Sequence, residues 1–185
     1  MKNKLNKNTL YKNIKKILSK WGFSKKGLFR NEKGEWYLFS QILVIILHFL
    51  PSYPKIEYIS LPINIIFIII GISISIQGLI TAIKAFLDLG DNLTPLPYPM
   101  KESILIKTNS YKNSRHPLYK GLLLISLGIS IFLLSLIHLY LFISLAYILK
   151  IKALKEEERL KIRFIEYEKY INDVPAIVKN IKYLD

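Results

Sequence analysis

The 185-residue sequence contains no cysteine. Its absence excludes disulfides, thiolate nucleophiles and zinc sites that use cysteine ligands. Only three histidines are present, His48, His116 and His138, and they are too scattered along the chain to indicate a metal site. His48 and His138 lie inside apolar runs, so we expect them to form hydrogen bonds between packed helices.

Acidic residues are also scarce: 13 Asp and Glu accompany 27 Lys and Arg, a formal net charge of +14. A nucleic-acid-binding protein can be this basic, but this chain also has charge-free runs of 19, 26 and 29 residues at 36–54, 58–83 and 121–149. About 20 apolar residues span a membrane core of roughly 30 Å. The sequence therefore predicts an integral membrane protein in contact with membrane lipids, and no nucleic-acid partner.

Residues 1–35 form a basic segment that precedes the first apolar run, and residues 36–185 are expected to form one membrane domain. Apolar residues recur at helical spacing between Leu10 and Trp21, which predicts an amphipathic helix on an anionic membrane surface. A solvated tail is the alternative.

The apolar runs predict an all-α protein with about four transmembrane helices. The first two run from Trp36 to about Leu50 and from about Ile59 to Phe86. The stretch 117–154 would be about 57 Å long as one helix, so we expect a hairpin of two helices with a turn near 135–138. Gly128 and the nearby serines are small enough to pack these two helices closely. Lys and Arg favour the cytoplasmic side, which predicts cytoplasmic N- and C-terminal helical extensions and a cytoplasmic 88–117 connection.

A polar cluster at 111–121 precedes the hairpin. Pro95, Pro97 and Pro99 predict an extended loop before it. Pro117 suits the first turn of a helix, which places Arg115 and His116 beside backbone donors that attract anionic groups. An interfacial anchor, with Arg for lipid phosphates and Tyr at headgroup level, is the alternative interpretation.

The segment 150–185 is expected to extend the last helix until Pro175 ends it. Lys152 and Glu156 are four residues apart and share a face of this helix. Taken alone, the run Glu156–Glu158 is typical of a solvated face.

The second half of the chain resembles the isoprenylcysteine carboxyl methyltransferases and phospholipid N-methyltransferases, which are integral membrane enzymes. The resemblance covers residues 89–178 and rests on Leu89-Gly90, Pro95-x-Pro97-x-Pro99, Tyr111, Arg115-His116-Pro117-x-Tyr119-x-Gly121, Glu156-Glu157-x-x-Leu160-x-x-x-Phe164, Tyr167-x-x-Tyr170 and Val174-Pro175. Three positions depart from the family pattern: Lys152 replaces an arginine, Asn109 replaces a glycine and Ile165 replaces a glycine.

The resemblance implies S-adenosylmethionine as cofactor, bound without a Rossmann domain, and the chain has no glycine-rich turn of the dinucleotide-binding type. It implies a lipid or lipid-modified acceptor that is bound by Lys152 and Arg115. The implied cofactor-binding residues are Ser103, Ile104, Leu105, Ile106, Tyr111, His116, Pro117, Leu118, Tyr119, Glu156 and Glu157.

The chemistry of these side chains suits the cofactor, which combines an adenine, a carboxylate, an ammonium and a sulfonium. Glutamates match its cationic centres, tyrosines its purine, and arginine and histidine its carboxylate. The alternatives are a phospholipid or small-amphiphile N-methyltransferase, a sterol-reductase-like enzyme that uses NADPH, and a non-enzymatic lipid-binding membrane protein.

Overall fold

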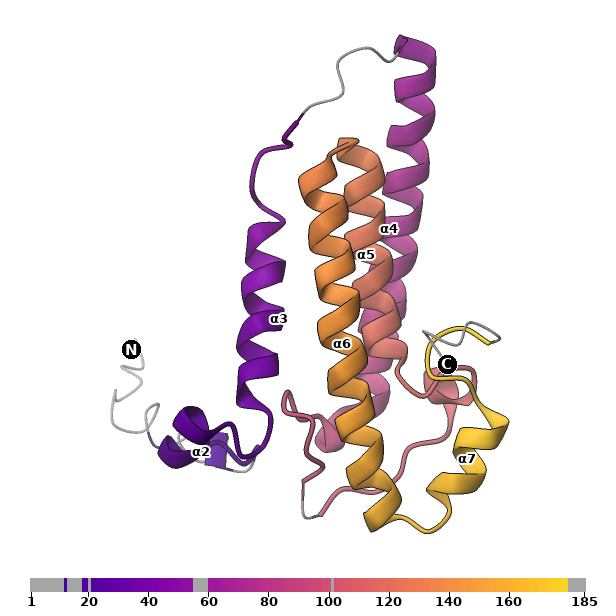
Figure 1. Cartoon of the computed structure of the whole chain (residues 1–185). Helices are drawn as coiled ribbons and strands as arrows, with labels where there is room; N and C mark the ends of the chain where they lie inside the picture. Colours follow the sequence, from indigo (N-terminus) through magenta and orange to yellow (C-terminus); the bar gives the residue numbers. More distant parts are fainter. Residues whose placement is uncertain (1–11, 13–17, 20, 55–59, 101, 180–185) are drawn as a thin grey trace, which may run out of the picture.

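A computed structural model describes residues 12, 18–19, 21–54, 60–100 and 102–179. Within these residues every regular element is a helix (Figure 1), so the all-α prediction is confirmed there. The elements are α2 (Lys25–Arg30), α3 (Glu35–Leu47), α4 (Leu61–Leu89), η1 (Gly90–Asn92), η2 (Asn109–Lys112), α5 (Pro117–Leu133), α6 (Leu136–Arg163) and α7 (Tyr167–Asp173). The amphipathic helix predicted between Leu10 and Trp21 falls mostly outside the described residues.

Helices α4 and α6 are long and apolar enough to cross a membrane. The 29 residues of α4 extend about 43 Å, which exceeds a membrane core of about 30 Å. Side chains on its outer surface, such as Ile66 and Leu79, are half exposed although they are apolar. These features indicate a membrane-associated protein. Helices α3 and α5 are apolar too, but each is shorter than 18 residues.

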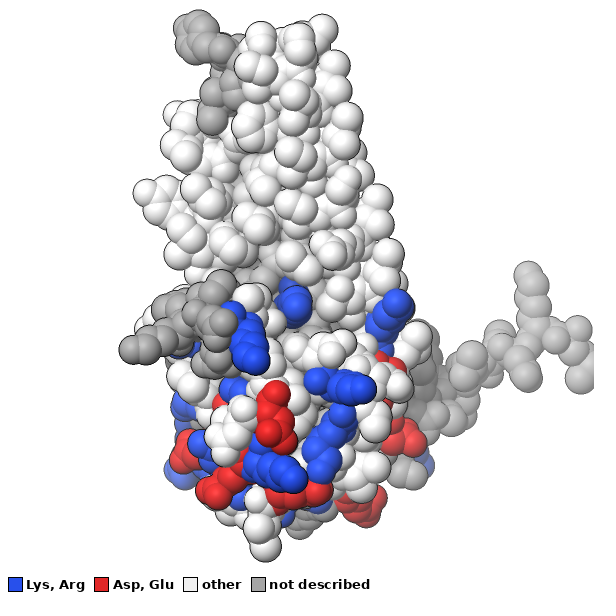
Figure 2. Space-filling model, turned by 90° about the vertical axis from the view of Figure 1, so that its right-hand side faces the viewer, with Lys and Arg blue, Asp and Glu red and all other residues white. Residues whose placement is uncertain are grey.

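Charged side chains gather at one end of the molecule, whereas the opposite end of the face shown in Figure 2 is uncharged. We call the charged end the polar end. It contains α2, the 93–108 loop, the part of α6 after Lys150, and α7 (Figure 1). Segment 94–100 of the 93–108 loop contains no helix, as the alternating prolines predict.

Helix α5 packs against α4 through paired glycines. A Cβ at Gly71 would lie 2.6 Å from the Gly128 carbonyl oxygen, and a Cβ at Gly78 would lie 2.7 Å from the Gly121 carbonyl oxygen. The prediction that Gly128 packs the hairpin was wrong, because this glycine faces α4 instead of α6. The pairs align because both helices repeat glycine every seven residues, about two turns, and run antiparallel.

Helices α5 and α6 form the predicted hairpin, but the turn is at Leu134–Ser135, and Leu134 adopts a left-handed conformation with φ of 46°. His138 therefore lies inside α6. Its Nε2 is 3.3 Å from the His48 carbonyl oxygen, and His48 Nε2 is 2.6 Å from Ser126 Oγ. The two histidines thus connect helices by hydrogen bonds, as predicted.

The C-terminal segment does not continue α6 to Pro175, as the sequence suggested. Helix α6 ends at Arg163, and Phe164 is extended, with φ of −123° and ψ of 107°. The chain then turns back through α7, which buries Tyr167 and Tyr170 and brings the Tyr170 hydroxyl to the Tyr111 carbonyl oxygen of η2. Burial of these two aromatic side chains stabilises the turn more than continuation of an exposed helix would.

Candidate functional site

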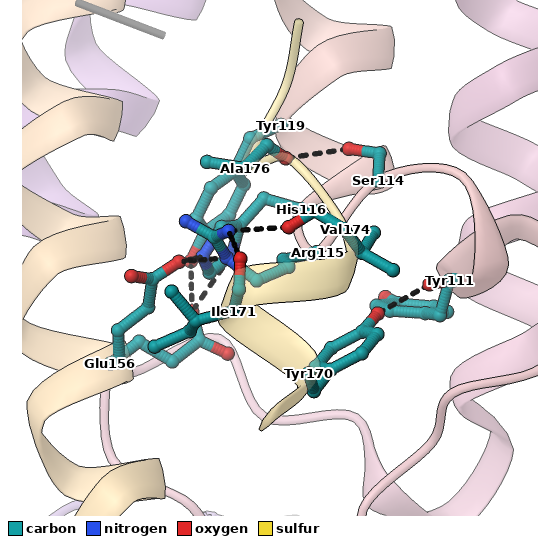
Figure 3. A network of polar contacts seen from close by, with 11 residues as sticks. Tyr111, Ser114, Arg115, His116, Tyr119, Glu156, Tyr170, Ile171, Val174 and Ala176 are labelled. Carbon is teal, nitrogen blue, oxygen red and sulfur yellow. Dashed lines mark hydrogen bonds and ion pairs between the residues drawn. The ribbon is translucent and has the colours of Figure 1, made fainter. Parts of the chain in front are cut away.

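Arg115 and His116 meet at one carboxylate, Glu157. Arg115 Nε donates to Glu157 Oε1 at 2.8 Å, and His116 Nε2 lies 2.9 Å from the same oxygen. The Arg115 guanidinium also donates to the carbonyl oxygens of Ile171 and Val174 (Figure 3). All three charged or titratable side chains are buried. We call Arg115, His116 and Glu157 the Arg115 clamp.

The chain after α7 completes the Arg115 clamp. The backbone N–H groups of Arg115 and His116 donate to the carbonyl oxygens of Pro175 and Ala176, at 2.9 and 3.0 Å. Ser114 Oγ donates to the Ala176 carbonyl oxygen at 2.6 Å. The backbone N–H groups of Arg115 and His116 are therefore satisfied by the protein itself.

The electrostatics of the clamp keep Glu157 ionised. Burial alone would raise the pKa of the Glu157 carboxyl, but hydrogen bonds and charge from His116 and Arg115 lower this pKa below its ordinary value. The guanidinium of Arg115 is consequently held by protein oxygens on several sides. Nε and Nη1 of Arg115 thus donate to protein oxygens, and the expected role of Arg115 in substrate binding stays a prediction.

Glu156, the neighbour of Glu157, points to a different set of groups. Its Oε2 accepts a hydrogen bond from the Tyr119 hydroxyl at 2.8 Å and lies 3.9 Å from His116 Nδ1. The rings of His116 and Tyr119 stack, with centroids 5.2 Å apart and planes 2° from parallel. Glu156, Tyr119 and His116 thus form a continuous polar surface at the start of α5.

Three further tyrosines surround this surface. The Tyr170 hydroxyl donates to the Tyr111 carbonyl oxygen, and the rings of Tyr167 and Tyr170 meet edge to face. Burial raises the pKa of Tyr170 to about 12 and raises the pKa of Tyr111 and Tyr167 further. These phenols therefore remain protonated near neutral pH, as the hydrogen bond donated by the Tyr170 hydroxyl requires.

Lys152 is the cation nearest this surface on α6, one helical turn before Glu156. It is 3 % exposed, and its ammonium donates to Gln41 Oε1 of α3 at 2.7 Å. The ammonium also lies 5.4 Å from the centre of the Tyr119 ring. Among the described residues no carboxylate lies within 4 Å of it. A buried cation with a neutral amide partner is suited to receive an anionic group from a ligand.

Two cavities open beside these residues. One of about 240 Å³ is lined by His116, Leu118, Tyr119 and Lys152, together with apolar side chains of α3 and α4. A smaller one of about 70 Å³ is lined by Ser103, Ile104, Leu105 and Ile106. Residues shared by both linings join the two cavities: Leu89, Thr94, Tyr111, Arg115 and Glu156.

Most residues predicted from the sequence therefore line this pair of cavities. Pro117 and Glu157 do not: Pro117 is fully buried at the start of α5, and Glu157 belongs to the Arg115 clamp. Sequence reasoning missed Gln41, which holds Lys152. A glutamine inside an apolar membrane segment is costly, and this was the available signal that Gln41 has a role.

No protein-family model and no curated protein matches this sequence, so interpretation of the site rests on its residues and their geometry.

Proposed function

We propose that the protein is an S-adenosylmethionine-dependent membrane methyltransferase, similar to the isoprenylcysteine carboxyl methyltransferases, that acts on a lipid or lipid-modified acceptor. The observation that carries the proposal is the convergence of Tyr111, Tyr119, Glu156 and Lys152 on one pair of cavities at the polar end. These residues come from different elements separated by up to 45 positions in the chain, yet they supply aromatic, acidic and basic groups together.

The residues present fit the cofactor. Glu156 Oε2 is occupied by Tyr119, whereas Glu156 Oε1 has no hydrogen-bond partner among the described residues and Glu156 lines both cavities. This oxygen is available to a cationic group. Tyr111 would contact the purine, and the backbone of Ser103–Ile106 would supply polar contacts in the smaller cavity. Bound S-adenosylmethionine would supply an electrophilic methyl group on its sulfonium.

The acceptor end of the site is the larger cavity. Apolar side chains from α3 and α4, including Leu38 and Phe86, line it opposite the polar surface. Lys152 would bind an anionic group of the acceptor, while the apolar wall accommodates its hydrocarbon part. The buried Lys152 ammonium would disfavour the cation that methylation of a lipid amine forms at the same position. This supports O-methylation of a carboxylate over N-methylation of a lipid amine.

The chain would perform the reaction by alignment and desolvation. Methyl transfer to an anionic acceptor is a direct displacement that requires no base. Lys152 would orient the acceptor oxygen, and Glu156 would hold the cationic end of the cofactor. The Arg115 clamp would fix the start of α5 so that Tyr119 stays against Glu156. Exclusion of water from the cavity would strengthen these contacts.

The proposal includes a topology in which the hydrophobic helices α3, α4, α5 and α6 all cross the membrane. Both termini and the 88–117 connection would then lie in the cytoplasm. The position of the Arg115 clamp supports this arrangement, because it joins the start of α5 to the end of α6. An even number of crossings between these two points is required.

The test is calorimetry of the purified full chain in detergent. We expect saturable binding of S-adenosylmethionine and no binding of NADPH. Transfer of a labelled methyl group to a prenylcysteine carboxylate should follow, with less transfer to phosphatidylethanolamine. Saturable NADPH binding without S-adenosylmethionine binding would overturn the proposal in favour of a reductase.

A further inference from the structure

A second cluster of charged groups lies at the polar end, away from the Arg115 clamp. Lys155 and Arg159 lie one helical turn apart on α6, and Lys33 comes from the connection between α2 and α3. All three line one small pocket of about 70 Å³, together with Tyr98 of the 93–108 loop. Cationic groups from three separate parts of the chain therefore converge. We call this pocket the Tyr98 pocket.

Aromatic rings, instead of carboxylates, hold these cations. The Lys33 ammonium and the Arg159 guanidinium lie 5.3 and 5.4 Å from the centre of the Tyr98 ring, and the Lys155 ammonium lies 4.9 Å from the centre of the Tyr37 ring. None of the three cations has a carboxylate within 4 Å among the described residues. Cation–π contacts fix a cation without using all of its N–H donors. Donors therefore remain for an external anion.

Two glutamates, Glu32 and Glu158, also line the Tyr98 pocket, and both are exposed. They reduce the net positive charge of the pocket to that of one cation. A group with concentrated negative charge and several acceptor oxygens would satisfy the converging cations despite these glutamates. A phosphate has both properties.

The position of the Tyr98 pocket matches the level of lipid headgroups. Tyr37 lies in the first turn of α3, where the apolar run begins, and the neighbouring Trp36 side chain is 57 % exposed. Exposed Trp and Tyr side chains mark the boundary between the membrane core and water. Lys155, which contacts Tyr37, lies at this same boundary.

We propose that the Tyr98 pocket binds the phosphodiester headgroup of an anionic membrane phospholipid. The phosphate is recognised by Lys33, Lys155 and Arg159, and the acyl chains lie along the apolar surface of α3. This site is separate from the proposed acceptor cavity, with which it shares no lining residue. It therefore stands independently of the methyltransferase proposal.

The experiment measures binding of short-chain phosphatidylglycerol to the full chain in detergent by native mass spectrometry. The double variant Lys155→Gln, Arg159→Gln removes two of the three cations. Each cation near a phosphate contributes about 1 kcal/mol, so binding should weaken about thirtyfold. The matched control, Lys112→Gln with Lys169→Gln, removes the same charge from exposed positions in η2 and α7, and it should bind as the parent protein does.

A further variant, Tyr98→Leu, leaves every charge in place and removes the ring that holds Lys33 and Arg159. It should also weaken binding, which keeps the test decisive if the double variant does not fold. Equal binding by all variants would overturn the proposal. An equal loss in the control would assign the binding to net charge and would also overturn it. Inorganic phosphate that binds as tightly as the lipid would show a soluble ligand instead.

Discussion

Three consecutive glutamates on α6 should respond to alanine substitution in three different ways. Glu157 is buried and accepts hydrogen bonds from Arg115 and His116, whereas Glu156 lines the cavities and Glu158 is exposed. Glu157→Ala should reduce stability, Glu156→Ala should reduce cofactor binding, and Glu158→Ala should do neither. Because the three positions are adjacent, helix propensity and net charge change equally in all variants.

The stability lost in Glu157→Ala depends on the buried Arg115 charge that the substitution leaves without its carboxylate partner. Removal of one partner from a buried ion pair costs about 3–5 kcal/mol, because the remaining charge stays buried. Arg115 retains the carbonyl oxygens of Ile171 and Val174, so we expect about 3 kcal/mol. For a chain of this length that corresponds to a fall of about 6–12 °C in melting temperature.

Glu156→Ala should instead lower the affinity for the cofactor and leave the stability nearly unchanged. Loss of a charge-assisted hydrogen bond costs about 1.5–3 kcal/mol, so the affinity for S-adenosylmethionine should fall at least about tenfold. Thermal unfolding followed by tryptophan fluorescence and calorimetry in the same detergent would measure both quantities. Similar melting temperatures for all three variants would refute the clamp. Similar cofactor affinities for Glu156→Ala and Glu158→Ala would refute the assignment of Glu156.

The pH dependence provides an independent check on Glu157. Its pKa in the folded state lies below the ordinary value of 4.5. The stabilisation is therefore fully present above pH 4.5 and is lost as the pH falls through the lower pKa of the folded state. Glu157→Gln should remove this part of the acid-side loss of stability. An unchanged dependence below pH 4.5 would contradict the ionised, hydrogen-bonded state of Glu157.

Two further predictions concern the helix packing and the topology. Gly78→Ala should destabilise the protein by about 1–3 kcal/mol, because its Cβ would lie 2.7 Å from backbone atoms of α5, whereas Ser73→Ala on the exposed side of α4 should change the melting temperature little. Cysteines introduced at Asn113 and Lys179 should label from the cytoplasm in sealed vesicles, and one at Ile137 should label from outside or be protected. Labelling of 113 and 179 from opposite sides would contradict the shared site.

The helices were predictable because their length and apolar character are local properties of the sequence. Pro117 begins α5, as its missing N–H suggests, and the alternating prolines prevent helix formation in the 93–108 loop. The expected hairpin formed with its turn beginning one residue earlier than predicted. The partner of Gly128 was not predictable, because a small residue shows that some backbone approaches closely but does not identify which one.

The different positions of Glu156, which lines the cavities, and Glu157, which belongs to the Arg115 clamp, could not be predicted from the sequence. Adjacent residues on a helix point about 100° apart, so one can face a cavity while the other faces the protein interior. The direction depends on how α6 rotates against α5 and on where the chain after α7 lies. The backbone N–H groups just before α5 donate to the carbonyl oxygens of Pro175 and Ala176. Such backbone hydrogen bonds leave no side-chain pattern in the sequence, so they could not be predicted from it.

The arrangement of charges in the larger cavity has a consequence for the proposed reaction. Lys152 and Glu156 place one positive and one negative group on the same face of α6, beside apolar walls from α3 and α4. A cationic methyl donor and an anionic acceptor would each meet an opposite charge there. Transfer of the methyl group would cancel the charges of the sulfonium and of the acceptor carboxylate, so a poorly hydrated site would favour the transition state over the separated charges. The thioether and the ester that form would carry no charge at the reacting atoms and would be held less strongly, which would favour their release. An amine acceptor must be neutral to react and would become a cation on methylation, so it would gain neither effect. This asymmetry is the physical reason to expect an anionic acceptor.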